Sequence, residues 1–168
     1  MSVRLVPLDR AHLEPLEALV TDPDVLRFTR IPEPPPPGFA AGWIETYEEG
    51  RRLGTREAFA IVDADDAFLG LAVAPTIDRA TATAELGYVV TPAARGRGVA
   101  TQALRLLTEW AFAEQRLERL ELLISVDNEG SRRVAARCGY VFEGVLRSHY
   151  FKAGLREDTE LWSRLPGD

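Results

Sequence analysis

The sequence contains one cysteine, two histidines and a single lysine among 168 residues. One cysteine, Cys138, excludes an intramolecular disulfide framework, and the absence of cysteine or histidine clusters leaves no zinc-site spacing. No run reaches the roughly 20 apolar residues of a membrane-spanning helix, and the N-terminal segment lacks the apolar stretch of a signal peptide. We therefore expect a cytoplasmic protein with no structural metal and no membrane partner.

The chain has no excess of positive charge, because 26 acidic residues outnumber 20 basic ones and the formal net charge at pH 7 is −6. This balance argues against nucleic acid as a partner, since that binding depends on neutralising phosphates. Apolar residues make up 46% and charged residues 27%, which is typical of globular proteins. The length predicts one domain over residues 1–168.

The first half of the chain predicts helices followed by strands. Residues 4–8 form a short strand pattern, and Asp9 is a plausible N-cap for a helix that Pro15 splits or kinks. A proline run ends before a helix on which Phe39, Trp43 and Tyr47 recur every four residues. We interpret this aromatic stripe as facing the core, with a wall of an acceptor site as the alternative. Alternating segments separated by turn residues then predict an antiparallel meander of three strands, over 59–62, 68–74 and 84–90.

The second half predicts a strand–helix–strand passage and then more strands. A glycine- and arginine-rich turn leads into a helix whose apolar face would carry Ala100, Ala103, Leu104, Leu107 and Ala111. The expected later elements are a strand over 119–126, a helix over 129–137 and strands over 140–146 and 158–164. This order predicts an α+β fold.

The turn between the third meander strand and the next helix has the features of an anion site. The first amides of a helix have no internal partner, and the helix dipole favours negative charge there. Arg95 and Arg97 add charge that suits a pyrophosphate. From these residues alone, a tight glycine turn with two solvated arginines is an equal alternative.

Two other phosphate-binding motifs fit the turn poorly. A P-loop requires a lysine before serine or threonine, and no lysine lies here. A dinucleotide fingerprint requires a third glycine where this chain has Thr101, although Glu118 and Glu121 fall near the expected downstream distance. A nucleotide-binding oxidoreductase on a doubly wound sheet is therefore disfavoured.

At this point the sequence resembles the GNAT acetyltransferases, in particular their RimJ/RimL-like branch. Arg95-x-x-Gly98-x-Ala100 matches the acetyl-CoA motif of that family. Further matches follow in the family's order, so that the resemblance covers about residues 84–165: the segments beginning at Asn128, Arg137, Glu143 and Tyr150. Residues 1–83 match only in general layout, and family members differ there in their acceptor.

The resemblance implies a GNAT fold, an α/β sandwich-like arrangement with a mixed, mostly antiparallel sheet of six to seven strands. About four helices would flank it, with a splayed strand pair at its centre. The implied cofactor-binding residues hold acetyl-CoA as a cosubstrate and are Val89, Val90, Arg95, Gly96, Arg97, Gly98, Val99, Ala100, Thr101 and Asn128. Arg132 or Arg133 would also lie near the phosphates.

The family reaction is direct attack of an amine on the thioester, so that no covalent nucleophile is needed. Cys138 is then best explained as a small apolar core residue. Many family members place a tyrosine acid where this chain has Ala135, so Ser131 is the implied replacement, with a helix-capping role as its alternative. Glu85 is the expected base, directly or through a water, with pairing to an arginine as its alternative. His149 is expected to have a surface role.

The predicted function is therefore acetyl transfer from acetyl-CoA to a primary amine, either a protein N-terminus or a small molecule. The alternative from another class is a non-catalytic acyl-CoA-binding or regulatory module that kept the cofactor turn. A homodimer is common in the resembled branch.

Overall fold

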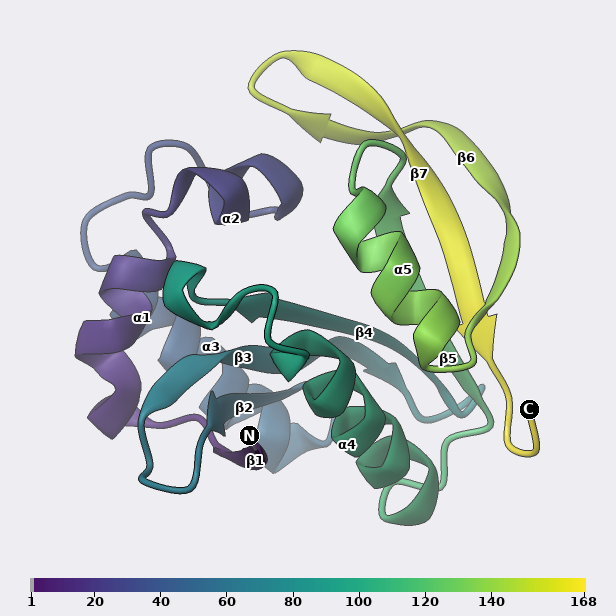
Figure 1. Ribbon diagram of the computed structural model, residues 1–168, viewed down its shortest axis with the longest axis horizontal. Coiled ribbons are helices and arrows are strands. Elements are labelled where there is room, and N and C mark those ends of the chain that lie inside the picture. The colour runs from purple at the N-terminus through teal and green to yellow at the C-terminus, as the bar shows by residue number, and fades with distance from the viewer. Residues whose placement is uncertain (1) are drawn as a thin grey trace.

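A computed structural model describes residues 2–168 as a seven-stranded sheet with helices on its faces (Figure 1). The strand order is β1-β2-β3-β4-β5-β7-β6. The α-helices are α1 Leu13–Leu19, α2 Pro23–Phe28, α3 Phe39–Leu53, α4 Val99–Ala113 and α5 Glu129–Arg137. The strands are β1 Arg4–Pro7, β2 Glu57–Val62, β3 Phe68–Asp78, β4 Thr83–Val90, β5 Arg119–Ser125, β6 Val141–Lys152 and β7 Leu155–Arg164. The mixed sheet confirms the predicted fold class.

The first four strands pair antiparallel in chain order, which confirms the predicted meander. Every residue of β2 is buried, because helices cover both faces of this part of the sheet. One core lies under α1 and α3 and includes Leu16, Ile44 and Leu71. A second core lies under α4 on the opposite face. Two-sided burial explains why the β2 sequence is continuously apolar after Glu57.

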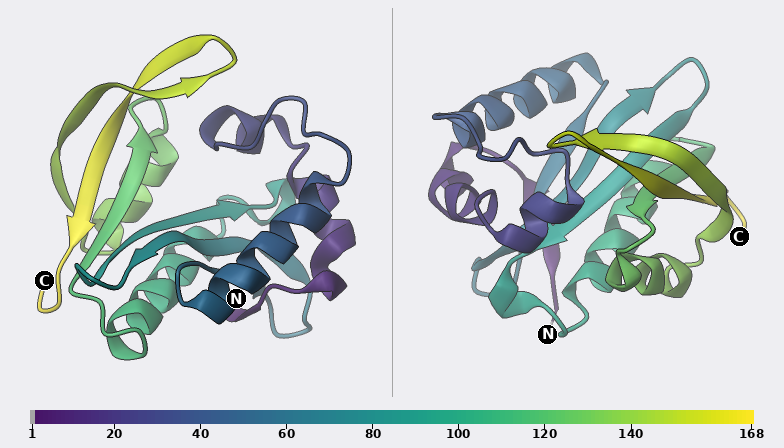
Figure 2. Two further views of the ribbon diagram at one scale, coloured as in Figure 1. Left: turned by 180° about the vertical axis from the view of Figure 1, so that it is seen from behind. Right: turned by 90° about the horizontal axis from the view of Figure 1, so that it is seen from above.

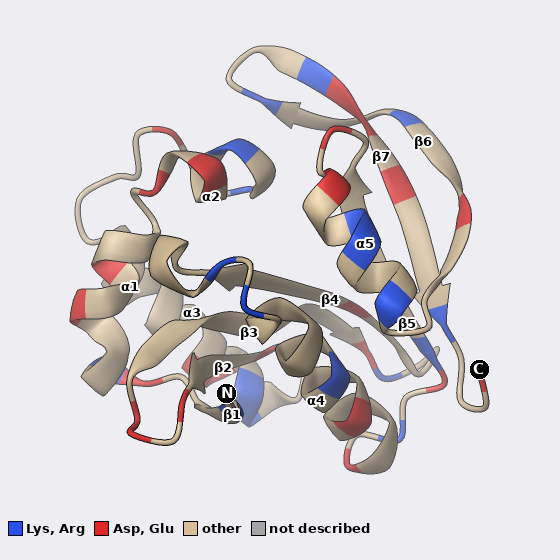
Figure 3. Cartoon of the chain, in the orientation of Figure 1, with Lys and Arg blue, Asp and Glu red and all other residues tan. Residues whose placement is uncertain are grey.

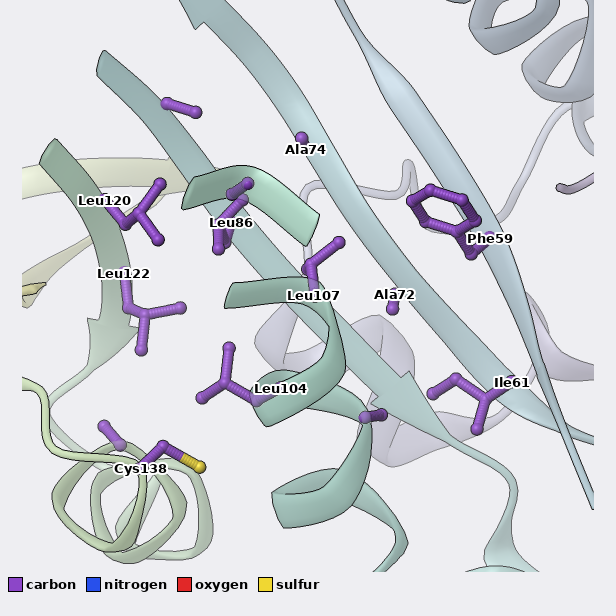
Figure 4. Packing of buried hydrophobic residues seen from close by; sticks show 14 of the residues in the cluster. Phe59, Ile61, Ala72, Ala74, Leu86, Leu104, Leu107, Leu120, Leu122 and Cys138 are labelled. Carbon is purple, nitrogen blue, oxygen red and sulfur yellow. The ribbon is translucent and has the colours of Figure 1, made fainter. Parts of the chain in front are cut away.

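Helix α4 packs its apolar face onto the middle of the sheet (Figure 4). Ala103, Leu104, Leu107 and Ala111 are fully buried there, as their helical spacing predicts. Ala100 is only partly buried, since it lies in the first turn beside the cleft described below. Cys138 packs into the same core, and its burial raises the pKa of the thiol.

Strands β4 and β5 are the parallel pair at the centre of the sheet, and they pair over only three residues each. Thr83, Ala84 and Glu85 lie opposite Arg119, Leu120 and Glu121. Beyond Glu85 the two strands no longer pair with each other and diverge, which agrees with the predicted splayed pair. The divergence opens the sheet toward the C-terminal end of β4.

The last two strands form a hairpin that is longer than the sequence predicts. Its tip reaches across to α2, as the view from above shows (Figure 2). The Tyr150 hydroxyl donates to the Thr29 carbonyl, and the Lys152 ammonium donates to the carbonyls of Thr29 and Leu26. These bonds place positive charge at the C-terminal end of α2, where the helix dipole favours it.

Two differences from the sequence-based expectation concern the N-terminal third. Five α-helices are present in residues 2–168 rather than about four, and α2 is the short helix that periodicity missed. Pro15 lies in the first turn of α1, where its missing N–H costs nothing, so it does not split that helix. Over the described residues, none of the helices has the length and apolarity that crossing a bilayer requires.

Candidate functional site

A cleft of about 780 Å³ lies where β4 and β5 diverge. Its walls come from α2 and α3 on one side, β4 along its length, and β5 with α5 on the other. The turn before α4 lines one end, and His149 and Tyr150 of the hairpin line part of the cleft. Segments from both halves of the sequence therefore meet at one concave site.

The glycine turn has the conformation that an exposed helix N-terminus requires. Gly96 and Gly98 have φ values of +71° and +78°, in the left-handed region that favours glycine. Gly98 is the N-cap of α4, and no side chain caps the helix. The first amides of α4, at Val99, Ala100 and Thr101, line the cleft and have no carbonyl partner four residues earlier within the helix. This end of the cleft can therefore bind an anion.

Arg95 lies at the edge of this turn but is paired within the protein. Its guanidinium donates to the carboxylate of Asp22 and lies 2.7 Å from that of Asp24, both at the start of α2. Burial raises the pKa of Asp22, but hydrogen bonds from Arg95 and from the Val25 amide outweigh this effect and hold it below the ordinary value. Arg97 is exposed in the turn and is not among the cleft-lining residues.

Strand β4 presents alternate backbone groups to the cleft. The Thr91 amide donates a hydrogen bond to the Leu69 carbonyl of β3. Because backbone groups alternate along a strand, the amides of Tyr88 and Val90 point away from β3. Val89 and Val90 both line the cleft, but by the same alternation the Val89 amide faces β3. Gly70 permits this packing, since a Cβ there would lie 2.1 Å from the Val89 carbonyl oxygen.

Glu85 lies at the last registered pair of β4 and β5, and its side chain faces the cleft. Nη1 of Arg30, in the segment after α2, lies 3.3 Å from both of its carboxylate oxygens. The Glu85 side chain is 22% exposed, so water reaches it. Glu85 thus forms the pair with an arginine that was the alternative to a role as base. Its carboxylate nevertheless faces the cleft.

The first turn of α5 forms the opposite wall. Asn128 caps the helix, because its side-chain oxygen accepts from the Ser131 amide at 3.0 Å. Asn128, Ser131 and Arg133 line the cleft. Arg132 points away and lies 3.4 Å from Glu160. Of the two arginines expected near a phosphate, Arg133 is therefore the one at the cleft.

Sequence reasoning missed two polar groups at this site. The Tyr88 hydroxyl on β4 lies 3.4 Å from the Ser131 carbonyl and lines the cleft, and burial raises its pKa to about 12. Arg30 was missed because α2 was not predicted. Tyr88 follows Glu85 by three residues, so alternation along β4 places the two side chains on opposite faces of the sheet and did not indicate Tyr88.

The aromatic stripe of α3 serves both interpretations given to it. Tyr47 is buried, and it packs with Trp43 and Phe39 against the core under α3. The three rings also line the cleft. They are therefore core residues whose outer edge forms a wall of the site.

Comparison with known proteins identifies related chains. The family model described as "Acetyltransferase (GNAT) domain" matches residues 2–141. Spermidine N(1)-acetyltransferase of Escherichia coli (strain K12) is 27% identical over 153 residues, which are 91% of this chain and 80% of that protein. Ribosomal-protein-serine acetyltransferase of the same strain is 31% identical over 101 residues, 60% of this chain and 56% of that protein.

A solved structure shares the fold over almost the whole chain. RimL, a ribosomal L7/L12 alpha-N-protein acetyltransferase in complex with coenzyme A, superposes with a TM-score of 0.90 at 19% identity. The match covers 98% of this chain and 94% of that one. The likeness establishes that the seven-stranded arrangement is the fold of these enzymes.

Proposed function

The chain belongs to the GNAT family of N-acetyltransferases, and we propose that it transfers an acetyl group from acetyl-CoA to a primary amine by direct attack in a ternary complex. The observation that carries this proposal is the open N-terminus of α4 at one end of a cleft formed by two diverging strands. An anion site in line with an open strand edge suits a cosubstrate with a phosphate group and an extended arm.

The residues of this chain fit such a cosubstrate. The amides of Val99, Ala100 and Thr101 would hold the pyrophosphate, and the left-handed Gly96 and Gly98 keep side chains out of its way. Five arginines and two carboxylates line the cleft, so its charge favours an anion. Arg97 would add charge at the turn. Arg95 would contribute at the same turn by positioning α2 through its ion pair with Asp22.

The reactive end would lie along β4. When bound, acetyl-CoA supplies a thioester whose carbonyl carbon accepts the amine. The amide of Val90 faces the cleft, and N–H groups preorganised toward a developing oxyanion contribute about 10²–10³ in rate each. Val89 would contact the arm through its exposed atoms. Asn128 would orient the arm with the amide nitrogen that its capping bond leaves available.

The amine has to lose a proton before or during attack. An α-amine titrates near 7.7–8.0, whereas a lysine side chain titrates near 10.4, so an α-amine needs less help from a base. Glu85 would accept this proton directly or through a water, because its carboxylate faces the cleft and remains partly exposed. Ser131, in the first turn of α5, would donate a hydrogen bond to the departing sulfur.

Binding and turnover are measured separately to test the proposal. Calorimetric titration with acetyl-CoA, coenzyme A, NADH and ATP should show binding of the first two only. A free-thiol release assay with a panel of amines and peptides should then show turnover. Failure to bind coenzyme A would reject the proposal.

One observation favours a second candidate, a non-catalytic acyl-CoA-binding module. Ala135, at the position where many relatives carry a tyrosine, is fully buried and cannot donate a proton. Such a module would bind coenzyme A with no turnover, and Ser131→Ala or Glu85→Gln would leave its behaviour unchanged. The single-domain organisation, cytoplasmic location and homodimer stay predictions, and sedimentation of the purified chain measures the last.

A further inference from the structure

The acceptor end of the cleft has an aromatic wall. Phe39 and Trp43 stack with ring centroids 6.5 Å apart, and Trp43 meets Tyr47 edge-on at 5.0 Å. Phe28 and Ile31, from α2 and the segment after it, line the same cleft. Rigid aromatic rings offer a large apolar contact at little cost in conformational entropy. This wall therefore matches an apolar or aromatic group on a ligand.

Charge at the cleft limits which amines can bind. The two carboxylates that line it among residues 2–168 are Asp24 and Glu85, and both already pair with arginines. Arg95 lies 2.7 Å from Asp24, and Arg30 lies 3.3 Å from Glu85. Five arginines line the cleft against these two carboxylates. Figure 3 shows that α2 and α5 carry basic as well as acidic residues.

Coulomb's law makes this pairing decisive for a ligand with several positive charges. A single ammonium can share the Glu85 carboxylate with Arg30, whose 3.3 Å contacts are longer than ordinary charged hydrogen bonds. A second or third ammonium would find no unpaired carboxylate in the described lining and would be repelled by the arginines. Polyamines are thereby disfavoured.

Tyr47 supplies a polar group beside the aromatic wall. Its side chain is buried, and the charges of Glu85 and Arg30 act on its hydroxyl, so the hydroxyl lies near the proposed base. Burial raises its pKa to about 12, so the hydroxyl stays protonated at neutral pH. A protonated hydroxyl in the lining of the cleft can donate a hydrogen bond to a polar atom of a ligand.

We propose that the acceptor is a monoamine that carries an apolar, preferably aromatic, group, and that polyamines are poor acceptors. This inference rests on the proposed acetyl transfer, since it concerns the acceptor of the same site. The amine nitrogen lies at Glu85, the apolar group lies against Trp43, and Tyr47 hydrogen-bonds a polar atom of the acceptor. A small arylalkylamine and a peptide that begins with an aromatic residue share this chemistry.

The direct test measures acceptor binding without turnover. Phenylethylamine, a tetrapeptide amide that begins with phenylalanine, and spermidine are each titrated calorimetrically into the protein saturated with coenzyme A. At least one aromatic amine should bind about ten-fold more tightly than spermidine, a difference of 1.4 kcal/mol. Comparing the affinities of the peptide and of phenylethylamine shows whether the acceptor is a peptide N-terminus or a small amine. Equal or tighter binding of spermidine, or no binding by either aromatic amine, would overturn the proposal.

Two variants, each with a control variant, test the two parts of the argument. Trp43→Phe keeps an aromatic ring and should retain most of the binding, whereas Trp43→Ala should weaken phenylethylamine about ten-fold and spermidine far less. Arg30→Glu should improve spermidine binding relative to phenylethylamine. Arg10→Glu is the matched control, because Arg10 pairs with Glu45 outside the cleft lining, and it makes the same change in net charge. An equal response to Arg10→Glu would refute the local charge argument.

The failure of this inference can be told apart from failure of the proposed function. If acetyl-CoA binds and the aromatic amines bind but no amine releases thiol, acetyl transfer is rejected while the order of acceptor binding still stands. If spermidine releases thiol faster than both aromatic amines, acetyl transfer stands and the acceptor class is rejected.

Discussion

Arg95 of the glycine turn forms an ion pair with Asp22, the residue that caps helix α2. The contact joins segments 73 residues apart and fixes α2 beside the proposed pyrophosphate site. Arg95 therefore helps to position α2 at the cleft, in addition to any direct contact with a ligand.

A double-mutant cycle measures this coupling. Asp22→Asn keeps an oxygen that can cap α2 but removes the charge, and Arg95→Gln removes the partner. We expect a coupling free energy of about 1 kcal/mol from chemical denaturation, because Asp22 is mostly buried while Arg95 is half-buried. Each single variant should also weaken coenzyme A binding. A coupling energy near zero would show that the pair does not hold α2.

Gly98 gives a test of the turn at the start of α4. Gly98→Ala forces a Cβ into a left-handed conformation, which costs roughly 1–2 kcal/mol of stability and shifts the amides that face the cleft. Coenzyme A affinity should fall with it, as measured by calorimetry. The matched control is Gly42→Ala in α3, where the new Cβ meets no atom within 4 Å. This control should stabilise the protein by about 0.5–1 kcal/mol and leave affinity unchanged.

Glu143 makes acid stability partly dependent on one carboxyl group. Hydrogen bonds from Arg119, and then from Ser163, lower its pKa from 4.5 to about 2 in the folded state. The unfolded chain therefore binds this proton more readily, so the stabilisation is complete above pH 4.5 and is lost as pH falls through about 2. Glu143→Gln should flatten the dependence of unfolding free energy on pH in this window. Glu17→Gln, at an exposed position of α1, should keep the slope of the parent protein.

Ser131 and Tyr88 are two hydroxyl-bearing residues on facing walls of the cleft, and both are candidates to donate to the departing sulfur. We expect Ser131→Ala to lower kcat about 10²-fold with little change in coenzyme A affinity. Tyr88→Phe should lower kcat less, since its hydroxyl is directed at the Ser131 carbonyl. Steady-state kinetics measure the change in kcat, and calorimetry measures the coenzyme A affinity separately. A larger loss from Tyr88→Phe would assign the donor role to Tyr88.

The hairpin tip is expected to depend on Lys152. Lys152→Met keeps a long side chain but removes the donor to the Leu26 and Thr29 carbonyls. Hydrogen exchange should then accelerate in residues 145–157 and in α2, while α4 keeps its protection. Tyr150→Phe, which removes the other bond to Thr29, should give a smaller change in the same segments. Unchanged exchange in the tip would show that the hairpin is held by other contacts.

Much of the fold could be predicted because local and tertiary preferences agree. The α4 face, the meander and the bounds of α5 follow from periodicity and from the Asn128 cap. Helix α2 was missed because it has only six residues, too few for a periodic pattern. Its proline at the first helical position and its Asp22 cap were the available signals.

The site was predictable where it depends on backbone conformation and less so where it depends on pairing. Gly96 and Gly98 in sequence already indicate left-handed turns before a helix. The partners of Arg95 and Glu85 come from α2 and the segment after it, and no local pattern links those to positions more than 50 residues away. Such ion pairs between residues far apart in sequence depend on how the two halves of the sheet come together in the fold.

Three residue pairs are the whole registered contact between β4 and β5. The backbone groups of β4 beyond Glu85 that face the cleft have no strand to bond, and water must satisfy them when the cleft is empty. A ligand arm that lies along β4 would take the place of that missing strand. Bound acetyl-CoA would then pair with β4 as a neighbouring strand does. The cosubstrate, which the reaction consumes, would therefore form part of the sheet for as long as it is bound.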